Sequence, residues 1–192
     1  IIKNPLLCVL TSISMDHMQY LGETLTDIAR NKCGIIKEGC TVISTMQDEE
    51  AELVIKETCA QKKSRLIFAD ASLAEYIYLG KKGNPSLQKQ AFVFEKEQYE
   101  ISLLGKYQIE NAVIALKAIE ELRAMGYGKI TDGKIKKGLI ETQWKGRFTL
   151  IADKPYFVVD GAHNVAAAKK LVHSMQFYFT NRKIVYIMGM FR

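Results

Sequence analysis

The first 70 residues alternate short apolar runs with segments of helical pattern, and this alternation most constrains the fold. Apolar runs at 6–13, 41–44 and 65–69 predict strands, and the intervening segments 24–32 and 48–62 have the apolar spacing or the charge order of helices. Strands that are separated by helices pair in parallel, because each connection must cross back over the sheet. The sequence therefore predicts an α/β fold that begins with a parallel layer.

Polar residues mark the ends of these two helices. Thr24 with Asp27 three residues later resembles a capping box, and Gly34 is typical of the position just after a helix. Asp48 is expected to cap the second helix, which has Glu in its first turns and Lys at its end. That charge order suits the helix dipole.

The middle of the chain has a different pattern. The segments 91–95 and 99–103 alternate apolar and polar residues around Lys96-Glu97-Gln98, which predicts a hairpin. The segment 109–125 has apolar residues at helical spacing, and a second, basic helix is expected at 131–142.

The remaining residues predict a second unit after a boundary near residue 147. Strands are expected at 148–152 and 156–160, a helix at 163–179 and a buried strand at 183–188. The chain begins with Ile1 and ends on this predicted strand, so we expect it to be cut at both ends.

The composition fits a folded, soluble protein. The chain has 192 residues, of which 48% are hydrophobic and 25% charged, and no run approaches the roughly 18–20 apolar residues of a membrane span. No secretion signal opens the chain. The four cysteines form no CxxC pair, so we expect free buried thiols and a cytoplasmic location.

The net charge of +6 is concentrated in residues 129–147, which hold six Lys or Arg against two acids. A solvated helix face is the simplest interpretation. The alternative is a basic wall that faces nucleotide phosphates or a polyacidic substrate. Nucleic acid is not expected as a partner, because no recognition motif accompanies the charge.

Three loops hold the candidate functional residues. Ser14-Met15-Asp16-His17 follows the first predicted strand, at the sheet edge where α/β proteins bind ligands. Lys32 lies at the end of the first helix, where it could simply complement the helix dipole. Asp160-Gly161-Ala162-His163-Asn164 joins a strand to a helix and could be either an anion site or only a capped turn.

Taken together, these segments resemble the folylpolyglutamate synthase/dihydrofolate synthase family of Mur-type ligases. The motifs follow the family order: Asp16-His17-x-x-x-Leu21-Gly22-x-Thr24, Ile28-Ala29-x-x-Lys32-x-Gly34-Ile35-Ile36-Lys37, Leu104-Gly105-x-x-Gln108-x-x-Asn111-Ala112, Trp144-x-Gly146-Arg147 and Asp160-Gly161-Ala162-His163-Asn164. The resemblance implies the second half of a central ATPase domain at 1–147 and the first part of a Rossmann-like C-terminal domain at 148–192. The Gly-rich phosphate loop of the family is absent from this sequence.

The resemblance also implies roles in metal binding. His17 would ligate Mg²⁺, although an imidazole is an unusual ligand for an ion that prefers oxygen. Lys32 would be carbamylated, catalytic and metal-binding. A carbamate forms from a neutral amine, so it requires a lysine pKa lowered by burial or by nearby cations.

Further roles concern the nucleotide. Asn111 and Arg147 would contact ATP, with Arg147 stabilising charge on the transferred phosphoryl group. Asp160 would bind ATP from the C-terminal domain, and His163 would act in the cleft between the domains. Tyr107 stands where the family often has histidine, so no role is carried over to it.

The implied function is ATP-dependent addition of L-glutamate to a folate or dihydropteroate carboxylate through an acyl phosphate. The expected partners are these small molecules, with no nucleic acid, no membrane and a monomeric state. The alternatives are another Mur-type ligase or a non-catalytic nucleotide-binding module. The isolated 192-residue chain could be inactive, because it lacks the phosphate loop.

Overall fold

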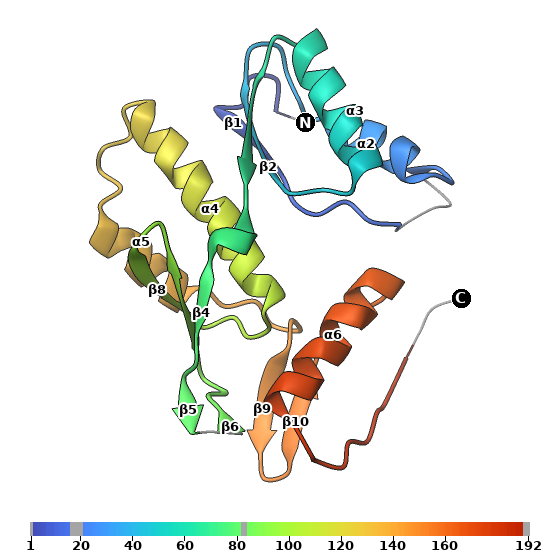
Figure 1. Ribbon diagram of the computed structural model, residues 1–192, viewed down its shortest axis with the longest axis vertical. Coiled ribbons are helices and arrows are strands. Elements are labelled where there is room, and N and C mark those ends of the chain that lie inside the picture. Colours follow the sequence, from blue (N-terminus) through green and yellow to red (C-terminus); the bar gives the residue numbers. More distant parts are fainter. Residues whose placement is uncertain (1, 16–20, 82–83, 190–192) are drawn as a thin grey trace.

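The computed structural model describes residues 2–15, 21–81 and 84–189 (Figure 1). Strands β1 (Leu7–Leu10), β2 (Thr41–Thr45) and β3 (Arg65–Ala69) form a parallel sheet in that order. Thr41 of β2 pairs with Leu7 on one side and with Arg65 on the other. The predicted parallel layer is thus confirmed.

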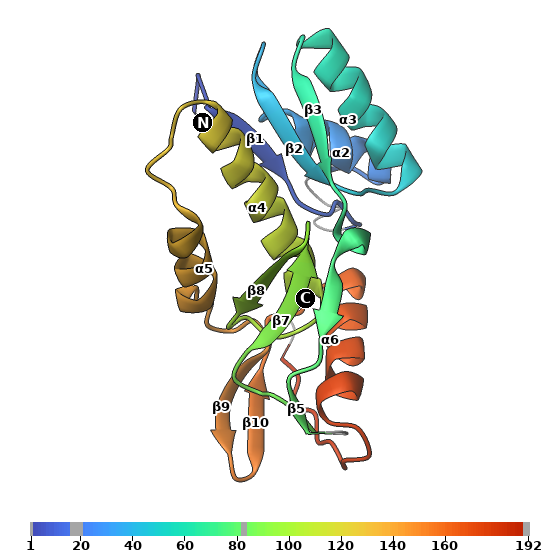
Figure 2. The ribbon, with the colours of Figure 1, turned by 60° about the vertical axis from the view of Figure 1, so that its left-hand side comes forward.

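Helices cover both faces of this sheet, as Figure 2 shows. On one face, α2 (Leu25–Cys33) and α3 (Glu49–Gln61) pack against a core that includes Val42. The next residue, Ile43, points to the other face and packs against α4 (Tyr107–Ala124). Alternate residues of β2 are therefore buried on opposite sides of the sheet.

The helix ends agree in part with the sequence. Thr24 caps α2 by accepting a hydrogen bond from the Asp27 N–H at 3.1 Å, as predicted. Gly34 follows α2 but has a right-handed φ of −56°, so α2 does not end on a left-handed glycine. Asp48 precedes α3, yet its side chain makes no capping hydrogen bond.

A second, antiparallel sheet follows the first. Its strands are β4 (Glu75–Ile77), β7 (Gln90–Phe94) and β8 (Glu97–Ile101), in that order. The β7–β8 hairpin turns at Glu95 and Lys96, whose φ angles of 50° and 69° suit the twist of a two-residue turn. The predicted hairpin is confirmed, but its turn lies earlier than the expected 96–98.

Short elements complete this part of the chain. They are the 3₁₀ turn η1 (Ala71–Leu73), the paired strands β5 (Gly80–Lys81) and β6 (Asn84–Pro85), and α5 (Asp132–Glu141). Thr131 caps α5 through the N–H of Lys134. Both predicted helices of this region are therefore present, and α5 packs against β8.

The last part of the chain is a hairpin followed by a helix. Strands β9 (Thr149–Asp153) and β10 (Tyr156–Val159) pair antiparallel, and Asn164 caps the N-terminus of α6 (Val165–Tyr178). A small core joins this unit to the rest of the chain: Leu104, Phe148, Tyr178 and Phe179. The domain boundary near residue 147 stays a prediction.

The buried strand expected at 183–188 is wrong. The described residues after α6 form no strand, and Val185 and Ile187 are 81% and 86% exposed (Figure 1). A strand needs a hydrogen-bonded neighbour, and none of the described strands pairs with this segment. The apolar pattern alone could not reveal that missing neighbour.

Candidate functional site

Four of the predicted site residues line one cavity of about 580 Å³. Asn111 comes from α4, Arg147 from the loop before β9, and Asp160 and His163 from the turn between β10 and α6. The loop after β1 also reaches this cavity. Residues that are far apart in the sequence therefore meet around a single space.

Two glycines hold the loops of the cavity together. The Gly161 N–H donates to the Gly146 carbonyl at 2.8 Å, and a Cβ on Gly161 would lie 3.3 Å from that oxygen. Gly146 has a φ of +79°, which a residue with a side chain rarely adopts. The Trp-x-Gly-Arg and Asp-Gly-Ala-His-Asn motifs are thus joined by a direct backbone contact.

Asp160 fixes the same junction with its carboxylate. One oxygen accepts from the Ala162 N–H and the other from the Phe148 N–H, each at 2.8 Å. Both bonds are charge-assisted and hold the two loops in register. Asp160 therefore positions the wall of the cavity, while its contact with ATP stays a prediction.

The start of α6 carries the two other polar residues of this motif. The Asn164 side chain accepts from the Ala167 N–H at 2.8 Å, which is the predicted capped turn. His163 is exposed, and its Nδ1 lies 2.9 Å from the Gly161 carbonyl oxygen. Its imidazole thus lines the cavity at the N-terminus of a helix, where negative charge is stabilised.

Arg147 and Asn111 are held by neighbours within their own motifs. The Arg147 guanidinium lies 5.3 Å from the centre of the Trp144 ring, at cation–π distance. The Asn111 side-chain amide donates to the Oε1 atom of the buried Gln108 side chain at 2.8 Å. In each motif, therefore, a second residue orients the side chain that lines the cavity.

Tyr107 is a lining residue to which the sequence assigned no role. Burial raises the pKa of its hydroxyl, and the nearby Asp160 carboxylate raises that pKa further. The hydroxyl is therefore neutral at physiological pH and can donate a hydrogen bond. The departure from histidine leaves a group here that cannot become a cation.

The loop after β1 brings hydroxyl groups to the cavity. Thr11, Ser12 and Ser14 line it, at the carboxyl edge of the parallel sheet. Gln47 holds this loop: its Oε1 accepts from the Ile13 N–H at 2.9 Å, and its Nε2 donates to the Thr11 carbonyl at 3.1 Å. Sequence reasoning named Ser14 but missed the others, although a hydroxyl run just past a strand end was a usable signal.

The resemblance implies two metal ligands, His17 and Lys32. His17 lies outside the described residues. Lys32 lies on the last turn of α2, where its side chain is exposed and does not line the cavity. Because Lys32 is exposed, it lacks the burial that would favour the neutral amine from which a carbamate forms.

The described residues also offer no alternative metal centre, since none of their His, Cys, Asp and Glu side chains forms a group of three that could hold an ion. They therefore do not fit a Mg²⁺ site by themselves. The role of His17 and Lys32 in metal binding stays a prediction from the resemblance.

The basic stretch 129–147 is mostly a solvated, ion-paired surface. Of its six Lys and Arg residues, only Arg147 lines the cavity. Lys136 pairs with Glu97 at 2.9 Å, and Lys137 lies 3.7 Å from Glu141. The geometry favours the simpler interpretation over a basic wall facing phosphates.

All four cysteines are free and buried, as predicted. Within residues 2–15, 21–81 and 84–189, no helix is long and apolar enough to cross a membrane.

The parallel sheet, α4 and this cavity define a Mur-type ligase domain. Residues 2–119 match the Mur ligase middle domain, and the chain belongs to that family. A dihydrofolate synthase/folylpolyglutamate synthase of Bacillus subtilis (strain 168) is 34% identical over 95% of this chain and 43% of the relative. A folylpolyglutamate synthase of Lacticaseibacillus casei is 29% identical over 92% of this chain and 41% of the relative.

A solved structure gives the same result. The complex of a folylpolyglutamate synthase (FPGS) with AMPPCP and folate matches 92% of this chain and 43% of its own, with a TM-score of 0.79 and 27% identity. The chain therefore spans less than half the length of the relatives that it matches.

Proposed function

We propose that the complete protein containing this chain is an ATP-dependent ligase. It joins the amino group of L-glutamate to a carboxylate of a folate or dihydropteroate. The observation that carries this proposal is the shared cavity lined by Asn111, Arg147, Asp160 and His163. The similar FPGS in complex with an ATP analogue and folate supports it.

The reaction needs ATP because a carboxylate is a poor electrophile. Its oxygen attacks the γ-phosphorus of ATP, the bond to ADP breaks, and an acyl phosphate forms. The amino group of glutamate then attacks the acyl carbon, loses a proton, and phosphate leaves as the amide forms. Positioning and charge neutralisation are the main contributions required of the protein.

The residues of the cavity fit these tasks. The Arg147 guanidinium would stabilise charge on the transferred phosphoryl group. The Asn111 amide would hydrogen-bond the nucleotide, and Asp160 would hold the two loops around it. His163, at the start of α6, would contact phosphate or the incoming glutamate.

Mg²⁺ would neutralise phosphate charge when it is bound. Of the two ligands that the resemblance implies, we propose only His17 for it, because Lys32 is exposed and does not line the cavity. The four free thiols support a reducing compartment, and we propose the cytoplasm and a monomeric state for the complete protein.

Hydroxylamine trapping tests the proposed chemistry. The complete protein is incubated with ATP and dihydropteroate or a reduced folate, with hydroxylamine in place of glutamate. The expected product is the hydroxamate of the substrate, formed with one ADP for each molecule. Arg147→Ala is expected to lower its rate about 10²–10³-fold, as losing one transition-state donor does.

Two outcomes would contradict the proposal. Hydroxamate formation with other carboxylic acids but not with folates or dihydropteroate would indicate another Mur-type ligase. ATP binding without hydroxamate from any acid would indicate a nucleotide-binding module.

A further inference from the structure

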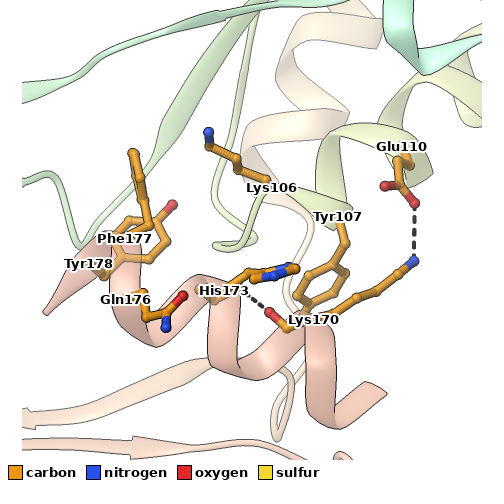
Figure 3. Close-up of a pocket in the computed structure, with 9 residues that line it drawn as sticks. Lys106, Tyr107, Glu110, Lys170, His173, Gln176, Phe177 and Tyr178 are labelled. Carbon is orange, nitrogen blue, oxygen red and sulfur yellow. Dashed lines mark hydrogen bonds and ion pairs between the residues drawn. The ribbon is translucent and has the colours of Figure 1, made fainter. Parts of the chain in front are cut away.

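A second cavity adjoins the first, on the other side of Tyr107 and Lys170, which line both. Its volume is about 400 Å³, and it lies between the start of α4 and the second half of α6. Figure 3 shows Lys106 on the α4 side and His173 on the α6 side, with Tyr107 towards one end and Phe177 towards the other, and the Lys106 ammonium directed away from His173. None of the described residues that are assigned to the proposed reaction lines this second cavity.

The charges of this cavity do not balance. Lys170 pairs with Glu110 at 3.1 Å, so those two charges neutralise each other. The Lys106 ammonium lies 5.0 Å from the centre of the Phe177 ring, and among the described residues no carboxylate forms an ion pair with it. His173 is exposed at the same cavity and carries no negative charge. The net charge is therefore positive.

Aromatic rings contact the Lys106 ammonium but do not satisfy all of its hydrogen-bond donors. Its ammonium also lies 5.6 Å from the Tyr76 ring, so it contacts two ring faces. Cation–π contacts attract the charge but do not accept all three of its N–H donors. Lys106 can therefore donate hydrogen bonds to an anion without first breaking an ion pair.

The basic residues of α5 differ in this respect. Lys136 is paired with Glu97, and Lys137 faces Glu141. An anionic ligand at α5 would have to compete with those carboxylates. A polyanion that extends from the first cavity is therefore better received by Lys106 than by α5.

We propose that this second cavity binds the carboxylates of a γ-linked glutamate tail on the folate substrate, with Lys106 as the main contact. The inference rests on the proposed function. A γ-glutamyl tail repeats one carboxylate per residue, separated by short methylene segments. Lys106 suits the carboxylate, and the Tyr107 and Phe177 rings suit the methylene groups.

Tail-length dependence of KM in the complete protein tests this inference. Lys106→Gln is expected to raise KM about fivefold for a folate with four glutamates, and much less for a folate with one. Lys106→Glu should enlarge that difference. A fivefold change is of the size expected for one partly exposed charge-assisted contact. Lys137→Gln, which removes the same charge from a site outside the cavity, serves as the matched control.

Calorimetric titration with free tetra-γ-glutamate gives a second measurement that needs no turnover. Lys106→Gln should weaken binding of this peptide about fivefold, and Lys137→Gln should not. An equal effect of Lys106→Gln and Lys137→Gln, or no peptide binding by the wild type, would overturn the inference. Lys106-dependent peptide binding without any turnover would support the cavity while contradicting the proposed reaction.

Discussion

At the residue scale, Gly105 connects the central part of the chain to α6. Its φ is +98°, and a Cβ at this position would lie 2.6 Å from the Tyr107 ring and 3.1 Å from the Ser174 hydroxyl. Its N–H points to the Tyr178 hydroxyl at 3.4 Å. A side chain here would both strain the backbone and push two packed residues away.

We therefore expect Gly105→Ala to lower the free energy of unfolding by about 1–3 kcal/mol, the cost of a strained backbone position. Urea denaturation measures the loss. Gly128→Ala is the matched control, because a Cβ at Gly128 meets nothing within 4 Å. Equal stability of the two variants would show that the backbone conformation and the close packing at residue 105 do not require a glycine.

Asp160 illustrates what the sequence predicts for single residues. The motif named Asp160 as a site residue, and the structure shows that it lines the cavity and that its two oxygens accept from Ala162 and Phe148. Those partners lie on both sides of the hairpin that joins β9 to β10, and their approach depends on the fold. Residue type and spacing identified the group, whereas its hydrogen bonds depended on tertiary structure.

At the element scale, the β1–β2 ladder ends where Gln47 begins its contacts. The last pair is Leu10 with Ser44, and the Gln47 amide then bonds the backbone of Thr11 and Ile13. The Gln47 side chain thus supplies the backbone hydrogen bonds that a neighbouring strand would otherwise supply to the loop that lines the cavity. This loop leads towards Asp16 and His17 in the sequence.

Gln47→Ala should therefore cost about 1–3 kcal/mol of stability, because backbone groups lose their partners. It should also weaken ATP binding by the complete protein, since the loop lines the cavity that we propose for the nucleotide. Denaturation and calorimetry measure the two effects. Gln61→Ala, at the exposed end of α3, is the control. Unchanged ATP affinity would contradict the role of Gln47 in positioning this loop.

The elements themselves were mostly predictable. Periodicity and caps located α2, β3 and α5 closely, because their signals are local. The strand expected at 183–188 was wrong, since pairing depends on a neighbour that local pattern does not show. The hairpin turn was predicted at 96–98 and lies at 95–96, because a run of polar residues does not show which of them adopt a positive φ.

At the scale of the whole molecule, buried thiols make the stability of the protein depend on pH in the alkaline range. Burial raises the pKa of Cys59 from 9.0 to about 11, and burial with the neighbouring Cys40 does the same for Cys8. Unfolding releases thiols that ionise near pH 9, while the folded thiols stay neutral. Their contribution to stability is thus complete below pH 9 and is lost as the pH rises towards 11.

The urea midpoint is therefore expected to fall between pH 9 and pH 11. Cys59→Ala should show a smaller fall over that interval, whatever its stability at neutral pH. An identical fall in the variant and the wild type would mean that Cys59 does not contribute to the pH dependence.

The central claim is that side chains from distant parts of the chain surround one nucleotide. Calorimetric titration of the complete protein with ATP tests this most directly. Asn111→Ala and Arg147→Ala, on α4 and on the loop before β9, are each expected to weaken ATP binding about tenfold, while Lys137→Gln leaves it unchanged. Wild-type affinity in both Asn111→Ala and Arg147→Ala would contradict the account.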